Sequence, residues 1–203
     1  MLTVARPPYL LRKIYPRCVW RMPANNNKIY LTFDDGPVPE VSPWVLDVLK
    51  HYKVKATFFC VGDNVKKHPE IYERILTEGH QVGNHTYNHI KGLRSANNDY
   101  FENVQQCHEL VNSRLFRPPY GQIKHSQQNY LAKKFRVIMW DVLSYDYSHL
   151  VSKEKCLNNV IKNTRNGSII VFHDSVKAYP NLQFALPRAI EYLQDKRFRF
   201  SLF

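Results

Sequence analysis

Short apolar runs alternate with amphipathic segments along most of this chain. The runs predict buried β-strands at 28–31, 55–61, 80–83, 115–117, 137–140, 168–172 and 197–203. Between them, apolar residues recur at helical spacing, which predicts helices after Ser42-Pro43, over 68–78, 98–113 and 126–134, after Ser152, and over 184–194. Ser42 and Ser152 are typical helix N-caps. Strands that alternate with helices predict a parallel sheet.

The predicted fold is therefore an α/β protein, a single distorted (β/α)7 barrel, with a doubly wound open sheet as the alternative. One regularity favours the barrel. Polar residues follow the carboxyl ends of five predicted strands, and in β/α barrels this rim is where active sites assemble. These residues are Asp34-Asp35, His85 with His89, Arg117 to Gly121, Asp141 with Asp146, and His173.

The first 27 residues differ from the rest because they contain several prolines and no clear periodicity. We expect residues 1–27 to form a basic N-terminal arm packed on the barrel, with Leu10, Tyr15 and Trp20 as anchors, and residues 28–203 to form the catalytic domain. A chain of 203 residues is long enough for one sizeable core.

Charge and cysteine content indicate which classes of partner and which compartment to expect. The formal net charge is +12, and no acidic residue precedes Asp34, a balance that favours an anionic glycan, a membrane surface or nucleic acid. The four cysteines form no Cys-x-x-Cys pair, which suits a reducing compartment. The apolar stretch near the amino terminus is broken by Pro7-Pro8 and makes a poor secretory signal. A cytoplasmic monomer is therefore expected, with a periplasmic or membrane-associated protein as the alternative.

The adjacent carboxylates Asp34 and Asp35 suggest a metal site. Like charges side by side repel each other, and a divalent cation removes the conflict when one carboxylate binds it and the other remains as a base. His85 and His89 have the spacing that places two imidazoles on one side of a turn. With Asp35 they make a two-histidine, one-carboxylate set, which suits Zn²⁺ and also Co²⁺, Ni²⁺ or Fe²⁺.

Hydrolysis also needs a base, an acid and a stabiliser of the developing charge. Asp34 can take a proton from water, and Arg117 can hold that carboxylate ionised. The backbone N–H of Tyr120 can donate to an oxyanion. His173 can protonate a leaving nitrogen while Asp146 orients its imidazole.

The motifs that carry these residues resemble those of the polysaccharide deacetylase family, also called the NodB-homology domain or carbohydrate esterase family 4. The matches extend from about residue 28 to residue 174, in the family's order. They are Thr32-Phe33-Asp34-Asp35-Gly36-Pro37, Ala56-Thr57-Phe58-Phe59, Gly62, His80-Gln81-Val82-Gly83-Asn84-His85-Thr86 with His89, Arg117-Pro118-Pro119-Tyr120-Gly121, and Ile169-Ile170-Val171-Phe172-His173-Asp174.

The resemblance implies a distorted barrel and metal-dependent removal of acetyl groups from N-acetylated sugars. It also implies a role for each site residue. Asp34 is the base with Arg117 as its partner, and His173 is the acid with Asp146 as its partner. The metal ligands are Asp35, His85 and His89, and the oxyanion and substrate residues are Tyr120, Val171, Trp140 and Tyr147. The fourth motif departs from the usual Asp-x-x-Asp-Trp, because Leu143 replaces the first acid and Tyr147 the tryptophan. We expect this departure to affect the substrate more than the reaction.

The predicted function is a hydrolase that releases acetate from N-acetylhexosamine units of peptidoglycan or a related glycan. One alternative is an N-deacylase of a small non-sugar amide on the same scaffold. Another is a non-catalytic protein that binds a glycan or a polyanion, but binding does not require a base, metal ligands and an acid together. For the same reason nucleic acid is not expected as a partner. A two-histidine, one-carboxylate oxygenase would leave Asp34 and His173 without a purpose.

Overall fold

The computed structural model of the protein describes residues 4–24 and 26–203, so residues 1–3 and Asn25 of the predicted arm lie outside it. Seven parallel strands curl into a half-barrel in the order β5-β4-β3-β2-β1-β7-β6, and β8 pairs with the start of β1. The strands are β1 (Lys28–Asp34), β2 (Thr57–Cys60), β3 (Gln81–Asn84), β4 (Leu115–Phe116), β5 (Arg136–Val137), β6 (Val142–Leu143), β7 (Ile169–His173) and β8 (Arg199–Phe200). The prediction of a distorted α/β barrel is confirmed.

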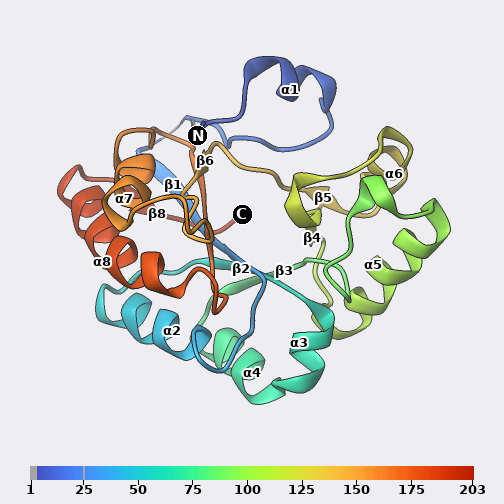
Figure 1. Cartoon of the computed structure of the whole chain (residues 1–203), viewed down its shortest axis with the longest axis horizontal. Helices are drawn as coiled ribbons and strands as arrows, with labels where there is room; N and C mark the ends of the chain where they lie inside the picture. Colours follow the sequence, from blue (N-terminus) through green and yellow to red (C-terminus); the bar gives the residue numbers. More distant parts are fainter. Residues whose placement is uncertain (1–3, 25) are drawn as a thin grey trace.

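Helices surround the strands as a ring (Figure 1). They are α1 (Tyr9–Ile14), α2 (Ser42–His51), α3 (Gly62–Lys67), α4 (Pro69–Thr77), α5 (Asn97–Val111), α6 (His125–Leu131), α7 (Lys153–Ile161) and α8 (Tyr179–Asp195), with short 3₁₀ turns η1 (Gly92–Arg94) and η2 (Pro119–Gly121). No helix in the described ranges is both long and apolar enough to cross a membrane.

Strand β1 lies at the centre of the sheet, and its residues are buried on both faces. Between Ile29 and Asp34 every residue is buried, and β1 pairs in parallel with β2 on one side and β7 on the other. In this register Asp34 lies opposite Phe59 and His173. The carboxyl ends of three neighbouring strands therefore meet at one level, as the sequence predicted for the rim.

The barrel has a gap between β5 and β6, and the N-terminal arm fills it. Only residues 138–141 connect the two strands, so this connection contains no helix. Instead, Val19 of the arm bridges to Ile138, with its N–H donating to the Val137 carbonyl at 2.8 Å. Further along the arm, Arg21 bridges to Ser168. Helix α1 lies between α6 and α7 in the ring (Figure 1).

A buried ion cluster fastens the arm to the barrel. The Asp141 side chain is fully buried and accepts hydrogen bonds from Arg12 at 2.8 Å, from Arg165 at 3.0 and 3.1 Å, and from Ser168 at 2.9 Å, with Arg6 Nε 3.7 Å away. Burial raises the pKa of Asp141, but the hydrogen bonds from Arg165, Ser168 and Arg12 outweigh it and hold that pKa below its ordinary value.

Four local predictions need correction. Asp141 was expected among the polar residues of the rim, but it precedes β6, and its carboxyl accepts from Ser168 just before β7. Leu10 is 68% exposed and anchors nothing, whereas Trp20 is buried. Ser42 is not the N-cap of α2, since Val41 holds that position and the Ser42 hydroxyl binds Asp174 instead. The strand expected over 137–140 ends at Val137, because Ile138 bridges to Val19 of the arm, and the separate strand β6 was not predicted. Ser152 does cap α7, accepting from the Lys155 N–H.

The arm cluster predicts a specific loss of stability. In Asp141→Asn, one oxygen becomes an amide nitrogen that faces three arginines, and we expect the free energy of unfolding at neutral pH to fall by about 3 kcal/mol. Because the folded state lowers the pKa of Asp141, its contribution is present above the unfolded pKa and is lost as pH falls through the folded value.

Urea denaturation of wild type and variant across this pH range measures both effects. The control is Asp195→Asn at the exposed end of α8, where we expect a change within about 0.5 kcal/mol. An Asp141→Asn protein as stable as the wild type at neutral pH would contradict the role of the cluster.

Candidate active site

A cavity of about 460 Å³ opens at the carboxyl ends of the strands. Nine of the eleven predicted site residues line it, and they are Asp34, Asp35, His85, His89, Tyr120, Trp140, Tyr147, Val171 and His173. The other two, Arg117 and Asp146, lie directly behind this lining and contact Asp34 and His173. Four lining residues were not among the predicted site residues, namely Gly121, Leu143, Ser175 and Lys177.

Asp35, His85 and His89 converge as a candidate metal centre. One ligand atom from each lies within 4.8 Å of the others, with Asp35 Oδ1 3.1 Å from His89 Nε2 and 3.7 Å from His85 Nε2. The Nδ1–H of His85 donates to the Arg117 carbonyl at 2.8 Å, so its Nε2 lone pair is directed at the centre. One carboxylate and two imidazoles with this outer hydrogen bond fit a divalent metal.

The backbone at two of these ligands is held in the left-handed region. Asp35 has a φ of 86° and His89 a φ of 55°, conformations that cost free energy in residues other than glycine. Asn64 stabilises the first by donating to the Asp35 carbonyl at 2.7 Å. Asn103 stabilises the loop before His89, because its side-chain oxygen accepts from the N–H groups of Tyr87 and Asn88. The spacing of the ligands did not reveal these supports.

The pKa values of Asp35 and His85 favour the binding of a cation. Burial raises the pKa of Asp35, but a hydrogen bond from His89 and the charges of His173 and His85 outweigh it, so the pKa lies well below its usual range. Burial lowers the pKa of His85 to about 4. At neutral pH the centre therefore presents one carboxylate and a neutral His85 imidazole, which are the protonation states that bind a metal.

Asp34 is paired with a buried guanidinium. Arg117 Nη1 donates to Asp34 Oδ1 at 2.6 Å and to the Thr32 hydroxyl at 2.8 Å, and Thr32 in turn donates to the Ile170 carbonyl. Asp34 lines the cavity, whereas Arg117 is completely buried behind it. The pair therefore presents to the cavity a carboxylate held by a fixed positive charge.

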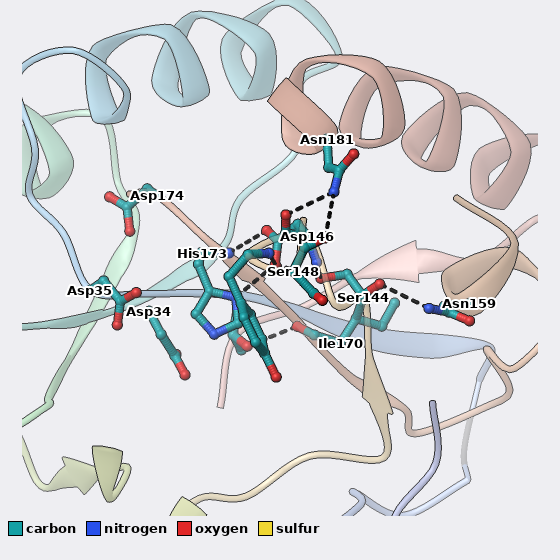
Figure 2. Close-up of polar contacts among 12 residues, drawn as sticks. Asp34, Asp35, Ser144, Asp146, Ser148, Asn159, Ile170, His173, Asp174 and Asn181 are labelled. Atoms are coloured by element: carbon teal, nitrogen blue, oxygen red, sulfur yellow. Dashed lines mark hydrogen bonds and ion pairs between the residues drawn. The ribbon is translucent and has the colours of Figure 1, made fainter. Parts of the chain in front are cut away.

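His173 is held by Asp146 on the other side of the cavity (Figure 2). The Nδ1–H of His173 donates to Asp146 Oδ1 at 2.8 Å, and the His173 backbone N–H donates to Oδ2 at 2.7 Å. Asn181 fixes the Asp146 carbonyl. Burial lowers the pKa of His173, but the Asp146 carboxylate and its hydrogen bond outweigh burial and raise the pKa to about 9.

Asp174 has a structural role that its place in the motif did not disclose. Its carboxyl accepts from the Gly36 N–H at 3.1 Å and from the Ser42 hydroxyl, and its own N–H donates to the Asp34 carbonyl at 3.0 Å. These contacts fasten the turn after β1 to the end of β7. Burial raises the pKa of Asp174 to about 8, so this carboxyl is largely protonated at neutral pH.

Aromatic side chains form one wall of the cavity. Trp140 packs over Gly121, where a Cβ atom would lie 2.4 Å from the indole, and Gly121 also has a φ of 65°. Trp20 of the arm supports Trp140 from behind, with ring centroids 6.3 Å apart. Tyr147 contacts the His173 ring edge-on at 4.8 Å. The arm therefore helps to build the wall.

Comparison with known families identifies the family of this chain. A family model described as "Polysaccharide deacetylase" matches residues 21–136, more than half of the chain. The chain belongs to the polysaccharide deacetylase family. This finding confirms the resemblance drawn from the motifs.

Several relatives support the membership in this family. Two peptidoglycan-N-acetylglucosamine deacetylases of Bacillus cereus are 38% and 34% identical to the chain, over 88% and 89% of its length and 67% and 88% of theirs. The crystal structure of a peptidoglycan N-acetylglucosamine deacetylase in complex with 4-naphthalen-1-yl-N-oxidanyl-benzamide is 34% identical. It has a TM-score of 0.88, over 96% of this chain and 94% of that one.

A third similar structure limits what membership alone can establish. It is described as a CE4 family pseudoenzyme from Bacillus anthracis, is 25% identical with a TM-score of 0.78, and covers 96% of this chain and 70% of that one. A polysaccharide deacetylase fold therefore occurs in a protein described as a pseudoenzyme. The residues in the cavity have to carry the argument for activity.

The ligand geometry predicts the effect of removing one imidazole. His85→Ala takes away a buried ligand, and we expect metal affinity to fall by more than the roughly 10- to 100-fold typical of outer-shell changes. Elemental analysis after loading and dialysis measures the bound metal. The matched control, His51→Ala, removes an exposed histidine of α2 and should retain metal. Wild-type metal content in His85→Ala would refute the ligand assignment.

Proposed function

We propose that this protein is a metal-dependent hydrolase that removes acetyl groups from the N-acetylglucosamine units of peptidoglycan and releases acetate. The observation that carries the proposal is that three groups of interacting side chains meet at one cavity. They are a carboxylate held by a guanidinium, a carboxylate with two imidazoles, and an imidazole held by a carboxylate. Amide hydrolysis requires a base, an electrophile and an acid, and each unit suits one of these roles.

Asp34 is the base in this proposal. Its ion pair with Arg117 fixes one carboxylate oxygen and leaves the side facing the cavity free to accept a proton from water. Asp35, His85 and His89 would hold the divalent metal. When bound, such a metal polarises a carbonyl oxygen and lowers the pKa of water. The donor set favours Zn²⁺, with Co²⁺, Ni²⁺ and Fe²⁺ as alternatives.

His173 is the acid. Because Nδ1 is committed to Asp146, Nε2 is the nitrogen left to face the cavity, and the raised pKa keeps the ring protonated at neutral pH. From there it can donate a proton to the amine nitrogen as the amide C–N bond breaks. Tyr120 and Val171 both line the cavity. In this proposal the Tyr120 backbone N–H donates to the developing oxyanion, and Val171 contacts the acetyl methyl group.

The relatives and the charge at the mouth both support peptidoglycan as the substrate. The two Bacillus cereus relatives are deacetylases of its N-acetylglucosamine. Lys177 lines the cavity and forms no ion pair with any described residue, so its ammonium group can meet a carboxylate of a peptidoglycan strand. Mature peptidoglycan lies outside the cytoplasmic membrane, and we propose that the protein acts there rather than in the cytoplasm.

Acetate release tests the reaction and the substrate together. With Zn²⁺ or Co²⁺ loaded, we expect release from peptidoglycan fragments that exceeds release from neutral N-acetylglucosamine oligomers and stops on chelation. The control is Asp34→Asn, which removes the proposed base but no metal ligand. It should retain its metal and lose turnover by about 100-fold or more.

Each other result would revise a distinct part of the proposal. Near-normal turnover in Asp34→Asn would remove Asp34 as the base. Release from small amides alone would favour the N-deacylase alternative. No release from any substrate, with metal bound, would place the chain with pseudoenzymes that keep the fold.

The His173–Asp146 pair predicts a pH profile. A raised pKa means that His173 is protonated below about pH 9 and loses its proton as pH rises through that value, so kcat/KM should fall on the alkaline side. Asp146→Asn removes the charge that raises the pKa, and the alkaline limb should move down by about one unit or more. Asp99→Asn on exposed α5 is the control. An unmoved limb in Asp146→Asn would contradict the role of His173.

A further inference from the structure

Helix α1 has the reverse of the usual arrangement of side chains. A surface helix normally turns its apolar side to the core and its charged side to water. In α1 no residue is buried, and Arg12 is the side chain that turns inward, where its guanidinium reaches the buried Asp141. Tyr9 and Leu10 are instead 72% and 68% exposed, and Ile14 is 43% exposed.

The exposed face is held in place rather than being a loose end. On one side of α1, the Ala5 carbonyl accepts from the Leu143 N–H at 2.8 Å. On the other side, the Tyr15 hydroxyl donates to the Ile123 carbonyl at 2.9 Å, and the Tyr15 ring stacks on His125. The arm therefore cannot turn its apolar side inward without breaking these contacts and the Arg12 ion pair. A fixed apolar face of this kind is typical of an interaction surface.

The charge around this face indicates which surface it meets. Lys13 and Arg17 are exposed beside it, Lys13 lies 5.0 Å above the Tyr9 ring, and the sequence contains no acidic residue before Asp34. Exposed aromatic and aliphatic side chains with basic residues at their edge suit the headgroup layer of an anionic bilayer. A second copy of the chain would instead bring the same positive charges together.

We propose that α1 and its flanking residues, with Tyr9, Leu10, Ile14, Lys13 and Arg17 as the contact side chains, form a docking face for an anionic lipid surface. With six residues, α1 is about 9 Å long, which suits contact with the interface and not passage through a hydrocarbon layer of about 30 Å. The face lies on the flank of the helical ring (Figure 1), whereas the cavity opens at the carboxyl ends of the strands. Docking would leave the cavity accessible to a glycan.

Vesicle co-sedimentation tests the proposal without reference to catalysis. The full chain should bind vesicles that contain phosphatidylglycerol at least about tenfold more tightly than vesicles of phosphatidylcholine alone, and salt should weaken the binding. Leu10→Gln with Ile14→Gln should lower binding to the anionic vesicles by about tenfold or more. Lys13→Glu with Arg17→Glu should abolish the preference for anionic lipid.

Matched variants on other helices of the ring serve as controls. Leu76→Gln with Leu110→Gln removes two exposed leucines from α4 and α5, and Lys50→Glu with Lys53→Glu reverses two exposed charges at the end of α2. Both should bind as the wild type does. Thermal unfolding and circular dichroism confirm that each variant is folded.

Three results would overturn the proposal. They are wild-type protein that does not prefer anionic vesicles, a Leu10→Gln and Ile14→Gln protein that binds them normally, and equal losses in the controls. A wild-type dimer that this double variant dissociates, seen by sedimentation equilibrium, would assign the face to a second copy instead.

Discussion

The buried guanidinium of Arg117 is the group on which the barrel and its chemistry both depend. It enters from the end of β4 and donates to Asp34 and Thr32 on β1. It also donates to the carbonyls of Ile138 and Met139, where the chain continues beyond β5, and its Cζ atom lies 4.1 Å from the Phe59 ring centroid. Removing a cation from water costs several kcal/mol unless its donors are satisfied, so these strands have to meet around it.

Three carboxyl groups at the cavity or behind its lining show how the surroundings of a side chain determine its role. Asp34 lies against a guanidinium, which suits a base, and Asp146 lies against the His173 imidazole, whose pKa it raises. Asp174 has only neutral donors from Gly36 and Ser42, and burial raises its pKa. The first two therefore act through charge, whereas a protonated Asp174 acts as a hydrogen-bonded link between β1 and β7.

The sequence was sufficient for the centre of the site because its key spacings are local. Asp34 and Asp35 follow one strand directly, and His85 and His89 share one loop, so their positions depend little on the rest of the fold. Contacts between distant segments could not be predicted in the same way. Ser42 looked like a helix cap, but its hydroxyl binds a carboxyl 132 positions away. Local propensity carries no information about such a partner.

The arm shows the same limit on a larger scale. Periodicity predicted seven strands with helices between them, but it did not disclose β6, the lack of a helix between β5 and β6, or the arm residues that lie there instead. Leu10 was expected to be an anchor because apolar residues usually point inward. Here the buried Asp141 reverses the choice, since an unpaired carboxylate inside the protein costs more than an exposed leucine. The ion pair between Arg12 and Asp141 therefore determines which side of α1 faces the protein.

The same arm also contacts the part of the site where this chain departs from its family. Leu143 stands where the motif usually has an acid, and its N–H donates to Ala5, while Trp20 supports Trp140. An isobutyl group in place of a carboxylate makes this part of the cavity lining apolar and removes a negative charge from it. The proposed base, metal ligands and acid form no hydrogen bond or ion pair with residues 4–24 of the arm. Changes at the contact between the arm and the barrel can therefore alter substrate choice, while Arg117 holds the proposed base Asp34 and the proposed ligand His85 independently of the arm.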